Sequence, residues 1–303
     1  MITLDKITKT YNKGTIKAVT DISLDIGRGE LFGLIGPDGA GKSTLFRILT
    51  TLLLADSGTA VVNGCDVVKD YAKIRSSVGY MPGRFSLYQD LTIEENLHFF
   101  ATVFGTTIKE NYDLIKDIYQ QIEPFKDRRA GRLSGGMKQK LALCCALIHK
   151  PTVLFLDEPT TGVDVVSRKE FWEMLARLKA EGITILVSTP YMDEADRCDR
   201  IALIQKGGIL SVDTPAGIVA DFPVDLYGVH AANTHRLLHE VRSYSGTDTC
   251  FAFGDALHVT FKAAQPDATK NLLPYLKEKG LPDATIGKIT PGIEDCFIHL
   301  LKN

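Results

Sequence analysis

The 303-residue sequence has no apolar run that could cross a membrane. A membrane-spanning helix needs about 20 consecutive apolar residues, and the longest run in this sequence is the short segment Leu141–Ile148. If the protein takes part in transport, the pore must therefore be formed by another chain.

The sequence also lacks an excess of charge of either sign. Its 35 Lys and Arg residues against 37 Asp and Glu residues give a net charge of −2 and an isoelectric point near 6.4, with the two signs interspersed. Neither a nucleic-acid-binding surface nor a patch for anionic lipid is indicated, so we expect no nucleic-acid partner.

Cysteine pairs with C-x-x-C spacing are absent, although the chain has six cysteines. No secretory signal precedes the first residues, and together these features predict free thiols in a reducing compartment, hence the cytoplasm. With 45% hydrophobic residues, 24% charged residues and 12 prolines, the composition is that of an ordinary globular protein with room for two cores.

A glycine-rich segment follows the apolar run 30–35 and precedes the predicted helix 43–49. It has the pattern of a phosphate-binding loop, Gly followed by four residues and then Gly-Lys-Ser, in the strand–loop–helix context that this loop requires. Backbone N–H groups of residues 38–42 would hold the β-phosphate of ATP, the lysine would reach the β- and γ-oxygens, and the serine would bind Mg²⁺. A simple glycine-rich turn is the alternative, which the flanking elements disfavour. The candidate ATP-binding residues are Gly36, Pro37, Asp38, Gly39, Ala40, Gly41, Lys42, Ser43 and Thr44.

Two carboxylates follow a second apolar run, Val153–Leu156. The run reads as a buried parallel strand whose carboxyl end carries Asp157 and Glu158. Asp157 would hold Mg²⁺ through water, and Glu158 would orient and polarise the attacking water. An ordinary acidic pair at a strand end is the alternative.

A third motif, Leu133-Ser134-Gly135-Gly136-Met137, precedes a predicted helix over 137–149. A hydroxyl and bare backbone donors at a helix N-terminus make an anion site, although a helix N-cap with two loop glycines is a common alternative. The three motifs in this order resemble the ATP-binding cassette (ABC) ATPases. In that family the third motif is a signature that caps the γ-phosphate of ATP held by the opposite subunit, which implies a second cassette, as a homodimer or a heterodimer.

The resemblance extends to other positions. Tyr11 is similar to the aromatic residue on which such cassettes stack adenine, although packing in a strand explains a lone Tyr equally well. Asp164 resembles the residue that couples the two nucleotide sites. The resemblance also implies that residues 84–88 and the helix predicted within 92–104 form the groove for a coupling helix of an integral-membrane permease. The protein would then be peripheral on the inner face of the cell membrane.

Two positions depart from the family pattern. Gly83 stands where the family has a Gln that senses Mg²⁺ and the attacking water, and Pro190 stands where it has its switch histidine. Gln89 could replace the first only if its loop folds back, and none of the seven histidines follows this strand. Loss of one preorganised donor typically costs about 10²–10³ in rate. Either neighbours such as Ser188, Thr189 or Gln89 compensate, or this site is weak and a partner cassette supplies the competent one.

The predicted fold class is α/β. Residues 1–221 would form a P-loop ABC ATPase core with an antiparallel β-subdomain near residues 1–30 and a helical subdomain near 88–145. Residues 222–303 read as strand, helix, two strands, helix and strand with a closing helix, which predicts a small ferredoxin-like α+β domain. Its tail, with Glu294-Asp295-x-Phe297, is similar to the tail of drug-exporter ATPases and would serve dimer stabilisation, regulation or simple capping.

The predicted function is that of an ATP-hydrolysing subunit of an ABC exporter of the drug-efflux type, with ATP and Mg²⁺ as cofactors. Export rather than import rests on the resemblance alone. The alternatives are a soluble ABC-type ATPase that acts on ribosomes, DNA or cluster assembly, and a regulatory subunit that uses ATP as a dimerisation switch. The transported compound cannot be read from this sequence, because membrane helices on another chain select it.

Overall fold

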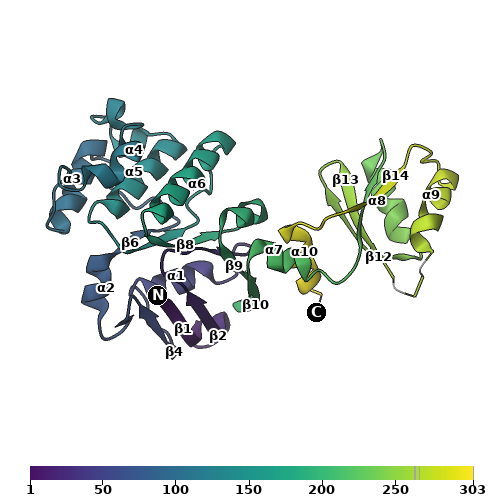
Figure 1. The fold of residues 1–303 in the computed structure, drawn as a ribbon, viewed down its shortest axis with the longest axis horizontal. Coiled ribbons are helices and arrows are strands. Elements are labelled where there is room, and N and C mark those ends of the chain that lie inside the picture. Colours follow the sequence, from purple (N-terminus) through teal and green to yellow (C-terminus); the bar gives the residue numbers. More distant parts are fainter. Residues whose placement is uncertain (263, 266, 303) are drawn as a thin grey trace. The chain divides into compact units, whose positions relative to one another are not determined.

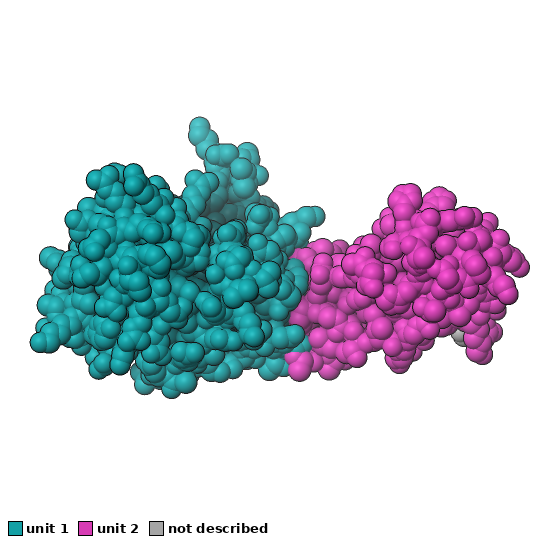
Figure 2. All heavy atoms as spheres, turned by 90° about the horizontal axis from the view of Figure 1, so that it is seen from above, with its two compact units in different colours: residues 1–215 teal, residues 216–303 magenta. Residues whose placement is uncertain are grey.

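The computed structural model describes residues 1–262, 264–265 and 267–302. The chain forms two compact units, Met1–Pro215 and Ala216–Asn303, which Figure 2 colours separately. The sequence placed this boundary after residue 221. The difference is helix α7 (Pro215–Ala220), which belongs almost entirely to the second unit.

A six-stranded sheet forms the centre of unit 1, in the order β10-β9-β3-β8-β7-β6. All neighbours are parallel except the β9–β10 hairpin at the edge. The strands are β3 (Leu31–Ile35), β6 (Val78–Met81), β7 (Val153–Asp157), β8 (Thr184–Thr189), β9 (Arg200–Gln205) and β10 (Gly208–Asp213). Residues of β3, β7 and β8 are buried throughout, as near-continuous apolar runs in a covered parallel sheet should be. Their carboxyl ends meet at one edge, where Ile35 pairs with Thr189 and Asp157 with Ser188.

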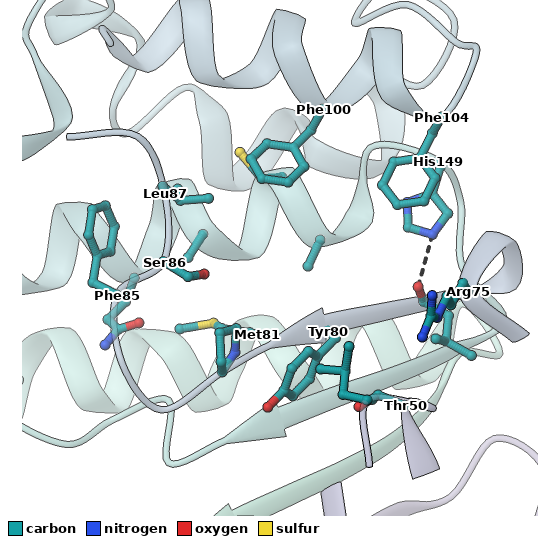
Figure 3. Close-up of a pocket in the computed structure, with 17 residues that line it drawn as sticks. Thr50, Arg75, Tyr80, Met81, Phe85, Ser86, Leu87, Phe100, Phe104 and His149 are labelled. Atoms are coloured by element: carbon teal, nitrogen blue, oxygen red, sulfur yellow. Dashed lines mark hydrogen bonds between the residues drawn. The ribbon is translucent and has the colours of Figure 1, made fainter. Parts of the chain in front are cut away.

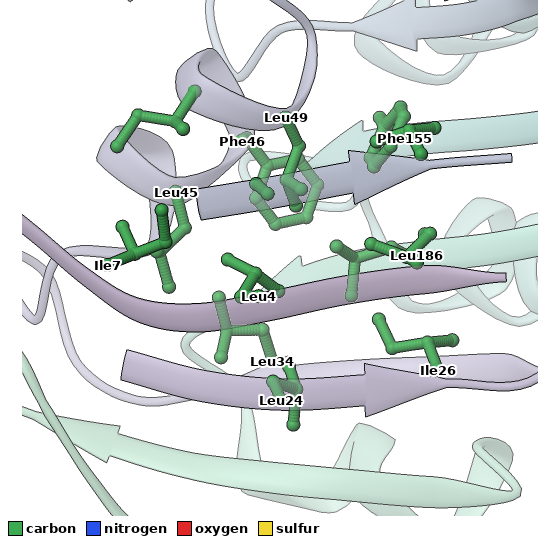
Figure 4. Close-up of a cluster of buried hydrophobic side chains, with 14 of the residues drawn as sticks. Leu4, Ile7, Leu24, Ile26, Leu34, Leu45, Phe46, Leu49, Phe155 and Leu186 are labelled. Atoms are coloured by element: carbon green, nitrogen blue, oxygen red, sulfur yellow. The ribbon is translucent and has the colours of Figure 1, made fainter. Parts of the chain in front are cut away.

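A second, antiparallel sheet lies against the first. Its strands are β1 (Ile2–Tyr11), β2 (Ile16–Ile26), β4 (Ser57–Val62) and β5 (Cys65–Asp66), in the order β2-β1-β4-β5. Side chains from both sheets and from helix α1 (Lys42–Leu49) share one core, drawn in Figure 4. Within it Phe46 of α1 meets Phe155 of β7 edge to face, with 6.2 Å between ring centroids. The predicted antiparallel β-subdomain is confirmed, and it extends beyond residues 1–30 to include β4 and β5.

Helices make up the rest of unit 1. They are α2 (Tyr71–Ser77), α3 (Ile93–Val103), α4 (Tyr112–Tyr119), α5 (Gly135–Leu147) and α6 (Val165–Ala180), with 3-10 turns at Glu123–Phe125, Ala130–Arg132 and Met192–Arg197. Helices α3 and α4 both pack on α5, away from the antiparallel sheet (Figure 1).

The start of α3 is specified locally. Thr92 caps it by accepting a hydrogen bond from the Glu95 N–H, and Glu95 accepts one in return from the Thr92 N–H. The two bonds together form a capping box. Asn96, which is fully buried, donates to the Tyr88 carbonyl at 3.0 Å and accepts from the Tyr88 N–H at 3.1 Å. This side chain therefore fixes the preceding loop to the helix.

Unit 2 is an antiparallel sheet covered by two helices. After α7, its elements are β11 (Leu226–His230), α8 (Thr234–Ser243), β12 (Thr247–Phe253), β13 (Ala256–Phe261), α9 (Ala268–Glu278), β14 (Thr285–Ile289) and α10 (Ile293–Leu300). The strand order β12-β13-β11-β14 and the βαββαβ succession are those of a ferredoxin-like domain. Leucines of α8 and α9 fill the core against the sheet.

Asp295 of the Glu294-Asp295-x-Phe297 tail has a structural role at the start of α10. Asp295 caps α10 by accepting from the Gly292 N–H at 2.8 Å, and its other oxygen lies 2.7 Å from Nδ1 of His258 on β13. One buried carboxylate thus starts the last helix and fastens it to the sheet.

Candidate nucleotide site

The glycine-rich loop connects β3 to α1 and admits no side chain at two positions. A Cβ at Gly36 would lie 2.1 Å from the Ile204 carbonyl oxygen, and a Cβ at Gly41 would lie 2.3 Å from the Ala18 carbonyl oxygen. Gly41 also has φ +108°, in the left-handed region. The backbone therefore passes tightly between β9 and β2, and its N–H groups lead into the N-terminus of α1, a geometry suited to phosphate.

Lys42 is buried beneath this loop. Its Nζ donates to the carbonyl oxygens of Gly36 at 2.7 Å and Pro37 at 3.0 Å, and lies 3.0 Å from Oε1 of Glu158. The Lys42 side chain is 2% exposed and that of Glu158 21%. The candidate catalytic carboxylate is thus the third oxygen partner of the ammonium.

Asp157 and Glu158 are held at the end of β7 by the neighbouring strand. The Ser188 hydroxyl on β8 donates to Oδ1 of Asp157 at 2.7 Å and accepts from the Glu158 N–H at 2.9 Å. Glu158 itself has φ +51°. Because this left-handed conformation is costly for a residue with a Cβ, the Ser188 bonds help to maintain it.

One open cavity collects the predicted metal and catalytic residues. Its lining comprises Ser43, Arg47, Leu52, Tyr80, Pro82, Gly83, Arg84, Asp157 and Glu158. Burial, and secondarily the Asp157 carboxylate, raises the pKa of Tyr80 to about 12, so its hydroxyl remains protonated. The Ser43 hydroxyl and the Asp157 carboxylate belong to residues that line this one cavity beside the loop. Both are oxygen ligands of the kind that Mg²⁺ takes. These residues fit a magnesium nucleotide.

Gly83 lies directly against this cavity. A Cβ there would be 3.1 Å from the Asp157 carbonyl oxygen and 3.7 Å from its Oδ2. Gln89 does not fold back. Its carbonyl oxygen accepts from the Gly131 N–H at 2.9 Å, its side chain lies beside Gly131, and it is absent from the described lining of the cavity. The rescue by Gln89 considered from sequence is therefore wrong.

The residues around Pro190 form a closed network of their own. The Thr189 hydroxyl donates to Oε2 of the buried Glu194 and accepts from the Tyr191 N–H at 3.1 Å. Thr160 donates to the same oxygen at 3.2 Å, and Arg168 of α6 stacks on the Tyr191 ring. Pro190 is thus held in a loop tied to α6, and the Ser188 and Thr189 hydroxyls proposed as substitutes are already engaged.

The signature segment lies at the start of α5. Ser134 is the N-cap and accepts from the Met137 N–H at 3.3 Å, while Leu133 is buried. A Cβ at Gly136 would lie 2.7 Å from the Ser167 hydroxyl on α6, so glycine allows the two helix starts to approach. None of residues 133–137 belongs to the described lining of the Glu158 cavity.

Asp164 and Tyr11 occupy separate places. Asp164 caps α6 by accepting from the Ser167 N–H at 3.0 Å, and this bond lowers the pKa of its carboxyl. Tyr11 ends β1 opposite Ile16, two residues along β2 from Ala18, which contacts the glycine-rich loop. The coupling role of Asp164 and the adenine-stacking role of Tyr11 stay predictions.

A mainly apolar groove of about 290 Å³ lies beside the cavity. In Figure 3, Phe100 of α3 and Phe104, which directly follows α3, face Tyr80 and Met81 of β6 across the groove, and the loop with Phe85 and Leu87 closes one side. His149 stacks on Phe104 with 3.8 Å between ring centroids, and its Nε2 lies 3.1 Å from the Val78 carbonyl oxygen. The groove is thus lined by residues 85–87 of the segment 84–88 and by Phe100 of the helix that the resemblance assigned to partner binding.

His149 predicts a pH dependence of folding. Burial lowers its pKa from the ordinary value of 6.5, opposed by the bond to the Val78 carbonyl. Below about pH 6.5 the unfolded chain therefore binds more protons at this side chain than the folded chain, and stability is lost as pH falls. Urea unfolding at pH 7.5 and 5.5 should show a larger loss of unfolding free energy for the wild type than for His149→Gln. Equal losses would contradict the assignment.

Three features define a P-loop nucleotide-binding protein: the glycine-rich loop after β3, the Asp157-Glu158 pair at the end of β7, and the mainly parallel sheet that carries both. A family model described as ABC transporter matches residues 19–161. The chain is 38% identical over 307 aligned residues to the probable multidrug ABC transporter ATP-binding protein YbhF of Escherichia coli K12, covering 99% of this chain and 52% of that protein. It is 33% identical over 292 residues to the Nod factor export ATP-binding protein I of Rhizobium sp. strain N33, covering 93% and 91%. The chain belongs to the ABC transporter family, among its ATP-binding proteins.

Solved structures agree with this assignment. The dimeric bacterial ABC transporter cassette MJ0796 superimposes with a TM-score of 0.65 at 27% identity, covering 71% of this chain and 98% of that one. The same cassette in a post-hydrolysis state with ADP and phosphate gives a TM-score of 0.64. These matches confirm the cassette fold. The chain spans about half the length of YbhF. In the described part of the chain, no helix is long and apolar enough to span a bilayer.

Proposed function

We propose that this chain binds ATP with Mg²⁺ and hydrolyses it to drive export through a separate membrane permease. The observation that carries this proposal is the convergence of Lys42, Ser43, Asp157 and Glu158 on one edge of the sheet, with three of them lining one cavity and the fourth paired to it. The relatives named for multidrug and Nod factor export support the direction of transport.

Each residue has a role in this proposal. Backbone N–H groups of the loop and the Lys42 ammonium bind the β- and γ-phosphates, while Ser43 and Asp157 hold Mg²⁺, Asp157 through water. The bound metal neutralises charge on the phosphate oxygens. Glu158 orients and polarises the attacking water. Because Glu158 is paired with Lys42 at 3.0 Å, the phosphates must take over the ammonium before the carboxylate can act.

Two protein partners complete the proposal. The groove beside α3 offers apolar area for a cytoplasmic helix of an integral-membrane permease, which would keep the chain at the inner face of the membrane. The signature residues 133–137 would serve ATP on a second cassette, in a dimer such as that described for MJ0796. Residues 222–303 would form an accessory domain that stabilises or regulates the dimer.

Gly83 and Pro190 favour one alternative, a regulatory subunit that binds ATP with little turnover. Neither position supplies a side-chain donor to the cavity. The names of the relatives do not favour this reading or a soluble ATPase outside transport. In a heterodimer, the signature segment could still complete a competent site on the partner.

A matched pair of variants tests the permease groove. The tagged chain, recovered from membranes of cells that express it, should bring down a polytopic membrane protein, and Phe100→Asp should abolish this because a charge replaces a groove side chain. Phe125→Asp is the control, since Phe125 is exposed outside the groove. Equal recovery with both variants, or none with the wild type, would overturn the proposed partner.

A further inference from the structure

We propose that Arg84 supplies the γ-phosphate contact that positions 83 and 190 no longer provide. This inference rests on the proposed binding of ATP at the Lys42 site. It assigns a positive charge from the loop after β6 to the place where the family pattern has a neutral amide.

The neutral candidates for this contact are committed elsewhere. The Ser188 hydroxyl joins Asp157 to the Glu158 backbone, and the Thr189 hydroxyl joins Glu194 to the Tyr191 backbone. Gln89 lies beside Gly131, outside the described cavity lining. To approach a phosphate, each of these groups would have to leave its present position.

Arg84, by contrast, lines the cavity and is not engaged by another residue that the structure describes. It is exposed, it lines the same cavity as Ser43, Asp157 and Glu158, and it has no hydrogen-bond or ion-pair partner within the part of the chain that the structure describes. Its guanidinium is a fork of donors that matches the oxygens of a phosphate and carries a permanent charge. The side chain is therefore available without breaking an existing bond.

Glycine at position 83 gives this side chain room. The Cβ position of residue 83 lies 3.7 Å from Oδ2 of Asp157, so any larger residue would stand between the loop and the metal side of the site. With Gly83, the neighbouring arginine can reach across that space. The carboxylates of Asp157 and Glu158 are negatively charged and repel the γ-phosphate. A cation at the site would offset this repulsion.

Arg47 is the competing arginine, since it lines the same cavity. It lies on α1 one helical turn beyond Ser43, about 6 Å further from the helix N-terminus at which phosphate binds. Arg84 instead adjoins Gly83, where an added Cβ would lie 3.1 Å from the Asp157 carbonyl oxygen. The geometry thus favours Arg84.

Binding measurements test the inference independently of turnover. In the full chain with Glu158→Gln, which prevents hydrolysis, Arg84→Ala should raise the Kd for MgATP about 10- to 100-fold, since a charged hydrogen bond is lost. The Kd for MgADP should change by less than about twofold, because ADP lacks the γ-phosphate. Arg84→Lys keeps the positive charge but not the planar pair of donors, so its Kd for MgATP should lie between those of the parent and of Arg84→Ala. Arg28→Ala removes an equal charge from an exposed loop outside the cavity and is the control.

The outcomes separate the two levels of the proposal. If Arg84→Ala changes ATP and ADP binding equally or not at all, or if Arg47→Ala alone shows the selective loss, the role of Arg84 is overturned while ATP binding stands. If the parent chain binds neither nucleotide, or binds them as well after Lys42→Ala, the proposed nucleotide site fails, and the inference with it. An unchanged melting temperature for Arg84→Ala would show that the variant is folded.

Discussion

Glu158→Gln should lower ATP turnover about 10²- to 10⁴-fold, the range expected when a general base is lost, while ATP binding remains at least as tight as in the wild type. The physical reason for the second part is the ion pair with Lys42. The Lys42 ammonium lies 3.0 Å from the Glu158 carboxylate, so binding of phosphate must displace that carboxylate. A neutral amide gives up the ammonium at less cost, and it does not repel the γ-phosphate.

Phosphate release under steady state and equilibrium binding of ATP check this prediction together. Glu173→Gln is the matched control, because Glu173 is exposed on α6 outside the cavity. A parallel loss of binding and turnover would assign Glu158 a structural role instead. Unchanged turnover would exclude it as the group that activates water.

The phosphate-binding loop and the two strand-end carboxylates could be predicted because each is a local pattern. The loop Gly36 to Thr44 can be recognised from its own residues together with the strand before it and the helix after it. A parallel sheet then brings the carboxyl ends of β3 and β7 to one edge. The ferredoxin-like order followed from the succession of predicted strands and helices. The antiparallel β-subdomain was predicted from the pattern of residues 1–30 together with the resemblance to ABC cassettes.

Contacts between distant residues could not be predicted. Ser188 joins Asp157 to the Glu158 backbone across two strands, Asn96 fixes the loop at Tyr88, and Asp295 binds His258. Each depends on side-chain orientation after folding, which spacing along the chain does not determine. The same limit applies to Gln89. Its position six residues after Gly83 in the sequence allowed it to replace the missing glutamine, but in the structure it lies beside Gly131, outside the described cavity lining.

Restoring the family residues should give the opposite result to Glu158→Gln. The double variant Gly83→Gln and Pro190→His should raise turnover by up to about 10²–10³-fold, the cost that loss of one preorganised donor usually carries. The backbone allows both changes. Gly83 has no positive φ and its new Cβ would meet the Asp157 carbonyl at 3.1 Å, which requires a shift of a few tenths of an ångström, while Pro190 is half-buried in a loop whose Thr189–Tyr191 bond does not involve it.

The double variant also reveals whether the wild-type site is weak or differently built. If Arg84 replaces the missing glutamine, Arg84→Ala should reduce turnover strongly in the wild type and little in the double variant, because the introduced glutamine then makes the contact; this non-additivity is measurable as a coupling free energy. Brisk wild-type turnover that Arg84→Ala abolishes and the double variant does not raise would identify a complete site with an arginine solution. Background turnover that rises in the double variant, with Arg84→Ala silent in both, would instead identify a degenerate site that depends on a partner cassette, and would refute the role of Arg84 in hydrolysis.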